Sequence, residues 1–130
     1  MTFFERYFAA LDGPAPHSSL ELVSEDVEFT IQWADGADAR SRQFVGGREE
    51  LRRFIDAGDM RDWAHYIQFS GAAGDVEFAL GETRRDDGTR LGTFLAVAQL
   101  DADGRMVRYM VARSPAVAFR AGERVDAAAE

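Results

Sequence analysis

The second half of the chain is a run of strand patterns joined by short turns, and this run constrains the fold more than any other feature. Apolar residues recur at alternate positions, or without a break, in four segments: 63–69, 76–84, 91–100 and 105–113. Polar, Gly-containing turns separate the segments, and Asp86-Asp87-Gly88 is the strongest hairpin signal among them. We therefore expect four consecutive antiparallel strands.

The first half supplies helices and one further strand. Residues 4–11 and 48–57 carry apolar residues at helical spacing, and a short helix is expected to start near Ser18 or Ser19. Residues 26–33 alternate between apolar and polar, which predicts a half-buried strand. Residues 34–43 are polar and contain glycine, so we expect a loop there.

Helices early in the chain and strands late in it indicate an α+β fold. We expect a curved, mostly antiparallel sheet wrapped around helices into a cone, a cystatin-like α+β roll, with a cavity inside. One domain should span 1–120, followed by a frayed tail at 121–130. Because segment 91–100 is apolar on both faces, we also expect a homodimer through the outer face of the sheet.

Composition excludes several classes of chemistry. The chain has no cysteine, and all 15 basic residues are arginine, so disulfides, thiolate nucleophiles and Schiff-base lysines are absent. Its net charge of −8 disfavours nucleic acid as a partner. No dinucleotide or phosphate-loop motif and no paired-histidine spacing occurs, so we expect neither cofactor nor metal. Without a signal peptide or a long apolar run, we expect a cytoplasmic protein that does not enter membranes.

Three stretches, in this order, resemble the nuclear transport factor 2-like superfamily, which includes ketosteroid isomerase, the SnoaL-like polyketide cyclases and scytalone dehydratase. They are RYFAALDG at 6–13, FVGGREELRRF at 44–54 and LDADGRMVRY at 100–109. The resemblance implies an α+β cone that binds a small molecule inside and is often dimeric.

The resemblance also implies positions for catalytic residues. Tyr7 matches the tyrosine that donates a hydrogen bond to a developing oxyanion in ketosteroid isomerase. The two aspartates of that enzyme fall on Ile31 and Ala96, which move no proton, and the aspartate of the cyclases falls on Ser114. His65, in WAHYIQF, matches the catalytic histidine of the dehydratase.

Each candidate has a structural alternative. His65 suits acid–base catalysis, but it would serve equally as a buried histidine bonded within the sheet. Tyr7 is either a hydrogen-bond donor or a core tyrosine, and Asp35 is either an acid near the vacated base position or a solvated loop residue. Glu82 and Arg84 are either a pair at the cavity rim or surface partners. The residues expected to line the cavity are Phe4, Phe8, Phe29, Ile31, Trp33, Phe54, Trp63, Phe78, Phe94 and Met110.

Two functions remain open from the sequence. One is a cofactor-independent lyase or isomerase, dehydratase- or cyclase-like, acting on an apolar oxygenated ligand through a His65–Tyr7 pair. The other is a non-catalytic ligand-binding or dimerisation module that has lost the carboxylates of the family. A ligand-sized cavity exposed to both side chains favours the enzyme, and a filled cone favours the module.

Overall fold

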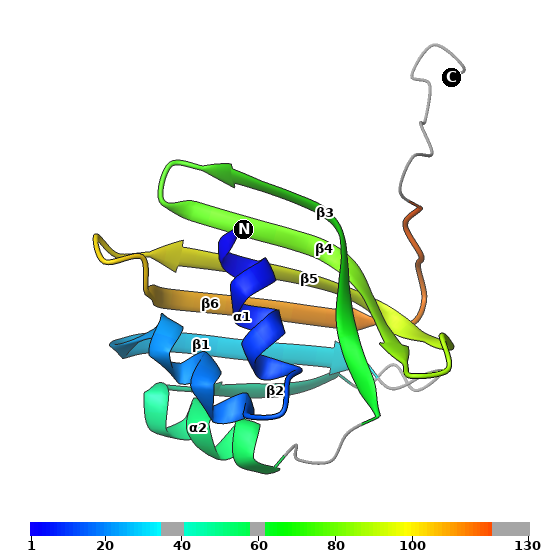
Figure 1. Ribbon diagram of the computed structural model, residues 1–130, viewed down its shortest axis with the longest axis horizontal. Coiled ribbons are helices and arrows are strands. Elements are labelled where there is room, and N and C mark those ends of the chain that lie inside the picture. Colours follow the sequence, from blue (N-terminus) through cyan, green and yellow to red (C-terminus); the bar gives the residue numbers. More distant parts are fainter. Residues whose placement is uncertain (35–40, 58–61, 121–130) are drawn as a thin grey trace.

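The computed structural model describes residues 1–34, 41–57 and 62–120 (Figure 1). These described residues form two α-helices, one short 3₁₀ helix and one sheet of six strands. In chain order the elements are α1 (Phe3–Leu11), η1 (Pro16–Leu22), β1 (Val23–Ala34), β2 (Ser41–Gly46), α2 (Arg48–Ala57), β3 (Trp63–Ala73), β4 (Val76–Arg85), β5 (Arg90–Leu100) and β6 (Met106–Ser114).

The sheet is mixed, with the strand order β2-β1-β6-β5-β4-β3. Strands β3 to β6 form the predicted antiparallel run, and only β1 and β6 pair in parallel. The helices cover one face of this open sheet, which confirms the predicted α+β class (Figure 1). The interior of the molecule therefore lies between α1, η1 and α2 on one side and the covered face on the other.

Aromatic side chains of α1 fill most of this interior. Thr2 caps the helix by accepting a hydrogen bond from the Glu5 N–H, and Phe4, Tyr7 and Phe8 are buried along one side. They pack against alternate residues of the sheet, among them Phe29, Ile31, Phe94, Ala96, Tyr109 and Val111. Ile31 faces inward as its alternation with Thr30 and Gln32 predicted, so the register of β1 is confirmed.

Two local predictions were wrong. Residues 41–43 belong to β2, which pairs with the end of β1, although their polar composition had favoured a loop. A bulge between Ile67 and Phe69 in β3 adds one residue, so Phe69 lies on the outer face while Trp63, His65 and Ile67 face inward. The alternating pattern cannot show such an insertion.

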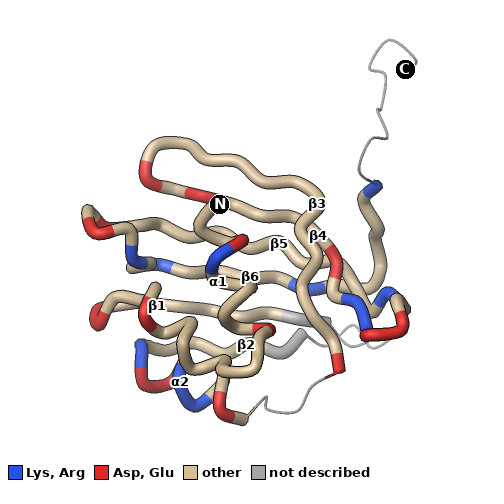
Figure 2. The backbone as a smooth tube through the Cα atoms, viewed as in Figure 1, with Lys and Arg blue, Asp and Glu red and all other residues tan. Residues whose placement is uncertain are grey.

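Charged residues gather at the turns, the strand ends and the helices, whereas the middle of the sheet carries few (Figure 2). The outer face consequently carries exposed apolar side chains on β3 to β6, which include Phe69, Phe78, Leu95 and Met110. Among the described residues, no helix is long and apolar enough to cross a membrane.

Candidate functional site

A small pocket lies between α1, α2 and the covered face of the sheet. Its volume is about 30 Å³, and its walls are mostly apolar. The lining residues are Tyr7, Leu11, Ile31, Leu51, Phe54, Ile55, His65, Tyr109, Val111 and Arg113. A volume of this size holds about two water molecules, since one needs roughly 10–15 Å³ of such space.

Asp12 and His65 form a buried pair beside this pocket. Asp12 is the residue that ends α1, and its carboxylate accepts a hydrogen bond from the backbone N–H of His65 at 2.8 Å. The same carboxylate lies 3.0 and 3.1 Å from Nδ1 of the His65 ring. The side chain of His65 is only 3% exposed and that of Asp12 is 11% exposed. The pair is thus held by two contacts, one to the backbone and one to the ring.

Aromatic rings fix the plane of the imidazole. Phe8 stacks on it with centroids 4.1 Å apart and an angle of 8° between the planes. Trp63 and Phe94 meet it edge-on at 5.2 and 5.0 Å. With one face stacked and the edge bonded to Asp12, the ring has a single orientation in the site.

The other ring nitrogen of His65 meets an arginine. Nη2 of Arg113 lies 3.3 Å from His65 Nε2, and the guanidinium sits 4.4 Å from the centroid of the Trp63 ring. Arg113 extends from the inner face of β6, two residues beyond Val111. The site therefore contains a chain of contacts in which the Asp12 carboxylate meets the imidazole of His65 and the imidazole meets the guanidinium of Arg113.

These contacts assign the proton of the imidazole. A guanidinium has only donors, so Nε2 must accept from Arg113 with its lone pair. An ionised carboxylate has only acceptors, so Nδ1 must carry the hydrogen that faces Asp12. The tautomer that satisfies both contacts is the neutral imidazole with its proton on Nδ1, and in that tautomer Nε2 is the nitrogen able to take a proton.

Tyr7 and His65 line the same pocket, as do Ile31 and Phe54 from the predicted lining. Phe4, Phe8, Phe29 and Phe94 are buried core residues, and Trp63 contacts Arg113 and His65. Asp35 and the side chain of Trp33 lie outside the described part of the structure.

Two predicted lining residues are on the wrong side of the sheet. Phe78 is 40% exposed and Met110 is 50% exposed, and both lie on the outer face. In β4 it is Glu77 and Ala79 that face inward, and in β6 it is Tyr109 and Val111. In β6 both faces are apolar, so the sequence did not distinguish the inner one. In β4 the more apolar face, with Phe78 and Leu80, is the outer one, so the alternation indicated the wrong face.

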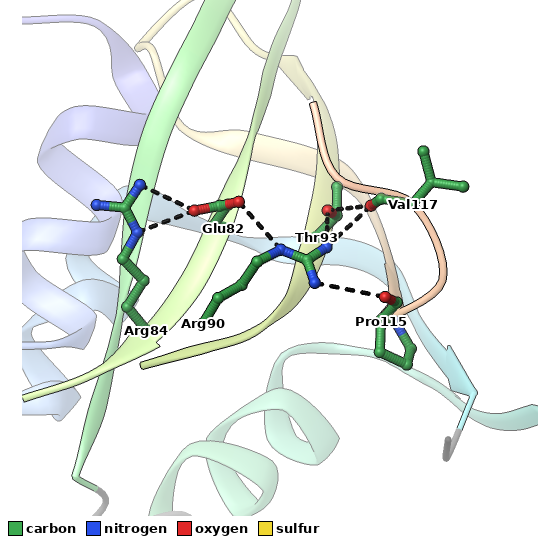
Figure 3. Close-up of polar contacts among 6 residues, drawn as sticks. All are labelled: Glu82, Arg84, Arg90, Thr93, Pro115 and Val117. Atoms are coloured by element: carbon green, nitrogen blue, oxygen red, sulfur yellow. Dashed lines mark hydrogen bonds and ion pairs between the residues drawn. The ribbon is translucent and has the colours of Figure 1, made fainter. Parts of the chain in front are cut away.

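Glu82 and Arg84 are an ion pair on the outer face and not at the rim of the pocket (Figure 3). The Glu82 carboxylate also accepts from Nε of Arg90 at 3.0 Å. Arg90 donates in turn to the carbonyl oxygens of Pro115 and Val117, and so holds the segment after β6 against the sheet (Figure 3).

Asp12 and Arg113 were not predicted from the sequence as part of the site. The only signal at Asp12 was its place immediately before Gly13-Pro14 at a helix end. Arg113 shares its strand face with Tyr109 and Val111, a face that the sequence left undecided. Among the described residues, no group of three His, Cys, Asp or Glu comes together as metal ligands.

Comparisons with known proteins identify the fold. No protein-family model matches the sequence, and no curated protein matches it. A candidate isomerase of the SnoaL-like family from Agrobacterium tumefaciens is 12% identical with a TM-score of 0.66, over 85% of this chain and 93% of that one. The candidate polyketide cyclase IdmH from Streptomyces antibioticus is 16% identical with a TM-score of 0.63, over 85% and 88%.

A third structure, from Catenulispora acidiphila, is described as having a ketosteroid isomerase-like fold and was solved with trimethylamine. It is 15% identical with a TM-score of 0.61, over 84% of this chain and 82% of that one. At these identities the likeness concerns the fold. The chain therefore has the α+β fold found in SnoaL-like, NTF2-like and ketosteroid isomerase-like proteins, the fold that the three sequence stretches predicted.

Proposed function

We propose that this protein is a cofactor-independent lyase or isomerase in which His65 moves a proton to and from a small oxygenated ligand. The observation that carries the proposal is the buried Asp12–His65 pair, in which the Asp12 carboxylate faces Nδ1 of the ring and His65 lines the pocket. A neutral imidazole oriented by a carboxylate is suited to act as a general base near neutral pH. The candidate isomerase and polyketide cyclase of the same fold support this reaction class.

In the proposed step, Nε2 takes a proton from a carbon next to a carbonyl group. The electron pair of the broken C–H bond moves into the carbonyl system and forms an enolate. Return of the proton to a different carbon completes an isomerisation. In a lyase the enolate instead expels a β-hydroxyl, which leaves as water with the proton from His65. In both cases His65 ends in its starting state.

Tyr7 is the proposed donor to the enolate oxygen. Its side chain is almost fully buried and lines the same pocket as His65. A hydrogen bond aimed at developing negative charge in a dry site stabilises the transition state more than the ground state.

The small volume of the pocket favours a second candidate, the non-catalytic binding or dimerisation module. About 30 Å³ accommodates no ligand of the expected kind unless side chains move. One measurement distinguishes the enzyme from the non-catalytic module, because only the enzyme exchanges the carbon-bound hydrogen of its ligand with solvent.

We also propose a homodimer through the outer face of the sheet. A groove of about 450 Å³ crosses this face, with Val45, Val97 and Met110 among its lining residues. Glu28, Thr30, Gln99 and Arg108 also line this groove, and exposed apolar side chains rimmed by polar residues are typical of a protein–protein contact.

The test is hydrogen–deuterium exchange at carbon. The protein is incubated in D₂O with a panel of small ketones and β-hydroxy carbonyl compounds, and loss of C–H signal is followed by NMR. We expect at least one compound to exchange, and His65→Gln to abolish the exchange. His17→Gln is the matched control, because His17 is the other histidine of the chain, is exposed, pairs with Asp56 and does not line the pocket. If no compound exchanges, or if His65→Gln exchanges as fast as His17→Gln, the enzyme proposal is wrong and the module is favoured.

A further inference from the structure

The segment that follows β6 is held on the outer face of the sheet by a buried carboxylate. The side chain of Glu82 is 10% exposed and binds Nε of Arg90 at 3.0 Å. Arg90 donates to the carbonyl oxygen of Val117 at 2.9 Å, and Thr93 donates to the same oxygen (Figure 3). These contacts fix residues 115–119, which we call the arm, although the backbone of the arm forms neither helix nor strand.

The arm presents two large apolar side chains to solvent. Val117 is 57% exposed and Phe119 is 45% exposed. Neither is among the described residues that line the groove on the outer face of their own chain. Holding a segment in place costs conformational entropy, and these two side chains recover little of it by burial within the chain. An anchored segment of this kind is typical of an interaction site.

The register of the sheet places the arm and the groove at different positions along the strands. Outward side chains form rows that cross the sheet, and neighbouring rows are two residues, or about 7 Å, apart. The arm covers the row that contains Glu82 and Thr93, and the next row contains Leu80 and Leu95. The groove takes the two rows beyond. Its lining residues are Val45, Thr30, Met110 and Val97 in the nearer row and Glu28, Arg108, Gln99 and Val76 in the farther one.

A second copy matches these features when the two-fold axis crosses the strands at Leu95. Such an axis exchanges the row on one side of Leu95 for the row on the other, so each arm lies over the row of Met110 in the other copy. An axis along the strands instead sets arm against arm and groove against groove, and two facing hollows leave apolar side chains without contacts. The raised arm and the hollow groove are therefore complementary only in the first arrangement.

We propose that the arm is a dimerisation element that places Val117 and Phe119 in the groove of a second copy of the chain. This inference rests on the proposed homodimer and goes beyond it by naming the two parts of the surface that meet. Each arm packs on the apolar side chains of Val97 and Met110, and the buried Glu82 holds the arm at the position where it reaches them. Each copy gives one arm and accepts one, so two equal contacts flank the axis.

Cysteine cross-linking tests this pairing, because the chain has no cysteine of its own. Val117→Cys and Met110→Cys proteins are mixed in equal amounts, left to exchange subunits and treated with a short bismaleimide, which tolerates small errors in geometry. Mass spectrometry separates the mixed product from the two symmetric ones. We expect the mixed product to predominate.

Ala9→Cys takes the place of Val117→Cys in the control mixture, since Ala9 is exposed on α1, on the other side of the sheet. A mixed product no more abundant with Val117→Cys than with Ala9→Cys overturns the inference. Predominance of Val117→Cys joined to itself overturns it as well, because arm then meets arm.

Phe119→Ala tests the contribution of the arm to affinity. We expect the dissociation constant of the dimer, measured by sedimentation, to rise at least about tenfold, as for loss of an aromatic anchor at an interface. Phe44→Ala is the matched control, because Phe44 is 47% exposed but lies on the helix side of β2, where it packs on Phe54. Equal dissociation constants for Phe119→Ala and Phe44→Ala contradict the inference.

Failure of the arm is distinguishable from failure of the dimer. A dimer in which the Val117→Cys and Met110→Cys chains do not join refutes the arm and keeps the dimer. A protein that sediments as a monomer refutes the dimer and the arm together. Neither result bears on the acid–base role of His65, which the exchange experiment measures.

Discussion

Asp12 is a carboxylate at the C-terminal end of a helix, where the helix dipole disfavours negative charge by about 0.3–1 kcal/mol. Asp12 contacts two nitrogens of His65, the backbone N–H and Nδ1 of the ring, and these contacts offset the unfavourable interaction with the helix dipole. The unfavourable placement is consistent with a role in orienting the imidazole.

We predict that Asp12→Asn slows exchange by about 10²-fold or more, since an amide can donate to Nδ1 and favour the wrong tautomer. The measurement is the exchange rate together with the ¹⁵N signature of the imidazole. A slow variant whose ring keeps its proton on Nδ1 would contradict the orienting role.

Tyr7 offers a second prediction at this scale. Tyr7→Phe should reduce the exchange rate on the order of 10²–10³-fold, the usual cost of one donor to an oxyanion. Tyr109→Phe is the matched control, since Tyr109 lines the same pocket and packs on Tyr7. An equal loss of exchange rate in Tyr7→Phe and Tyr109→Phe would contradict the role of Tyr7 as the donor to the enolate oxygen.

His65, Tyr7 and Ile31 could be placed at the pocket from the sequence because each lies on a clear apolar stripe. Asp12 and Arg113 could not. Asp12 meets His65 only through a contact between residues 53 apart in sequence, which no local spacing encodes. Arg113 lies on a strand whose two faces are equally apolar, so its direction depends on the whole sheet.

At the scale of the elements, the position of β3 depends on Gly81 in the neighbouring strand β4. A Cβ on Gly81 would lie 2.0 Å from the backbone oxygen of Tyr66, opposite the bulge in β3. We predict that Gly81→Ala destabilises the fold by about 1–3 kcal/mol, the range for forced overpacking, and displaces the strand that carries His65. Thermal unfolding measures the loss.

Gly47→Ala is the control for this prediction, because a Cβ there meets its nearest atom at an ordinary 3.6 Å. If Gly81→Ala and Gly47→Ala unfold at the same temperature, the close approach of β4 to β3 at Gly81 does not contribute to stability, and the prediction is wrong.

Helices and strands with one clear period were predictable from the sequence, and α1, α2 and the run from β3 to β6 lie close to their expected places. The bulge in β3 and the short strand β2 were not predictable. The first inserts a single residue into an unchanged alternation, and the second is a polar strand that forms because β1 offers it a free edge.

At the scale of the whole molecule, we expect a dimer. Leu95 is 42% exposed at the centre of the apolar outer face, so Leu95→Glu should place a charge in the contact and yield monomers. Light scattering should give twice the chain mass of 14.4 kDa for the unaltered protein and for Ala9→Glu, which adds the same charge on the helix side. A single 14 kDa species for the unaltered protein at micromolar concentration would contradict the dimer.

If Asp12 and His65 work as one acid–base unit, a double-mutant cycle on the exchange rate will show it. Residues that act as a unit have effects that do not add. We predict that the double variant Asp12→Asn/His65→Gln exchanges no more slowly than His65→Gln alone. The acid–base unit would be contradicted if the rate losses of the two single variants multiplied in the double variant. It would also be contradicted if His65→Gln kept the exchange rate of the unaltered protein.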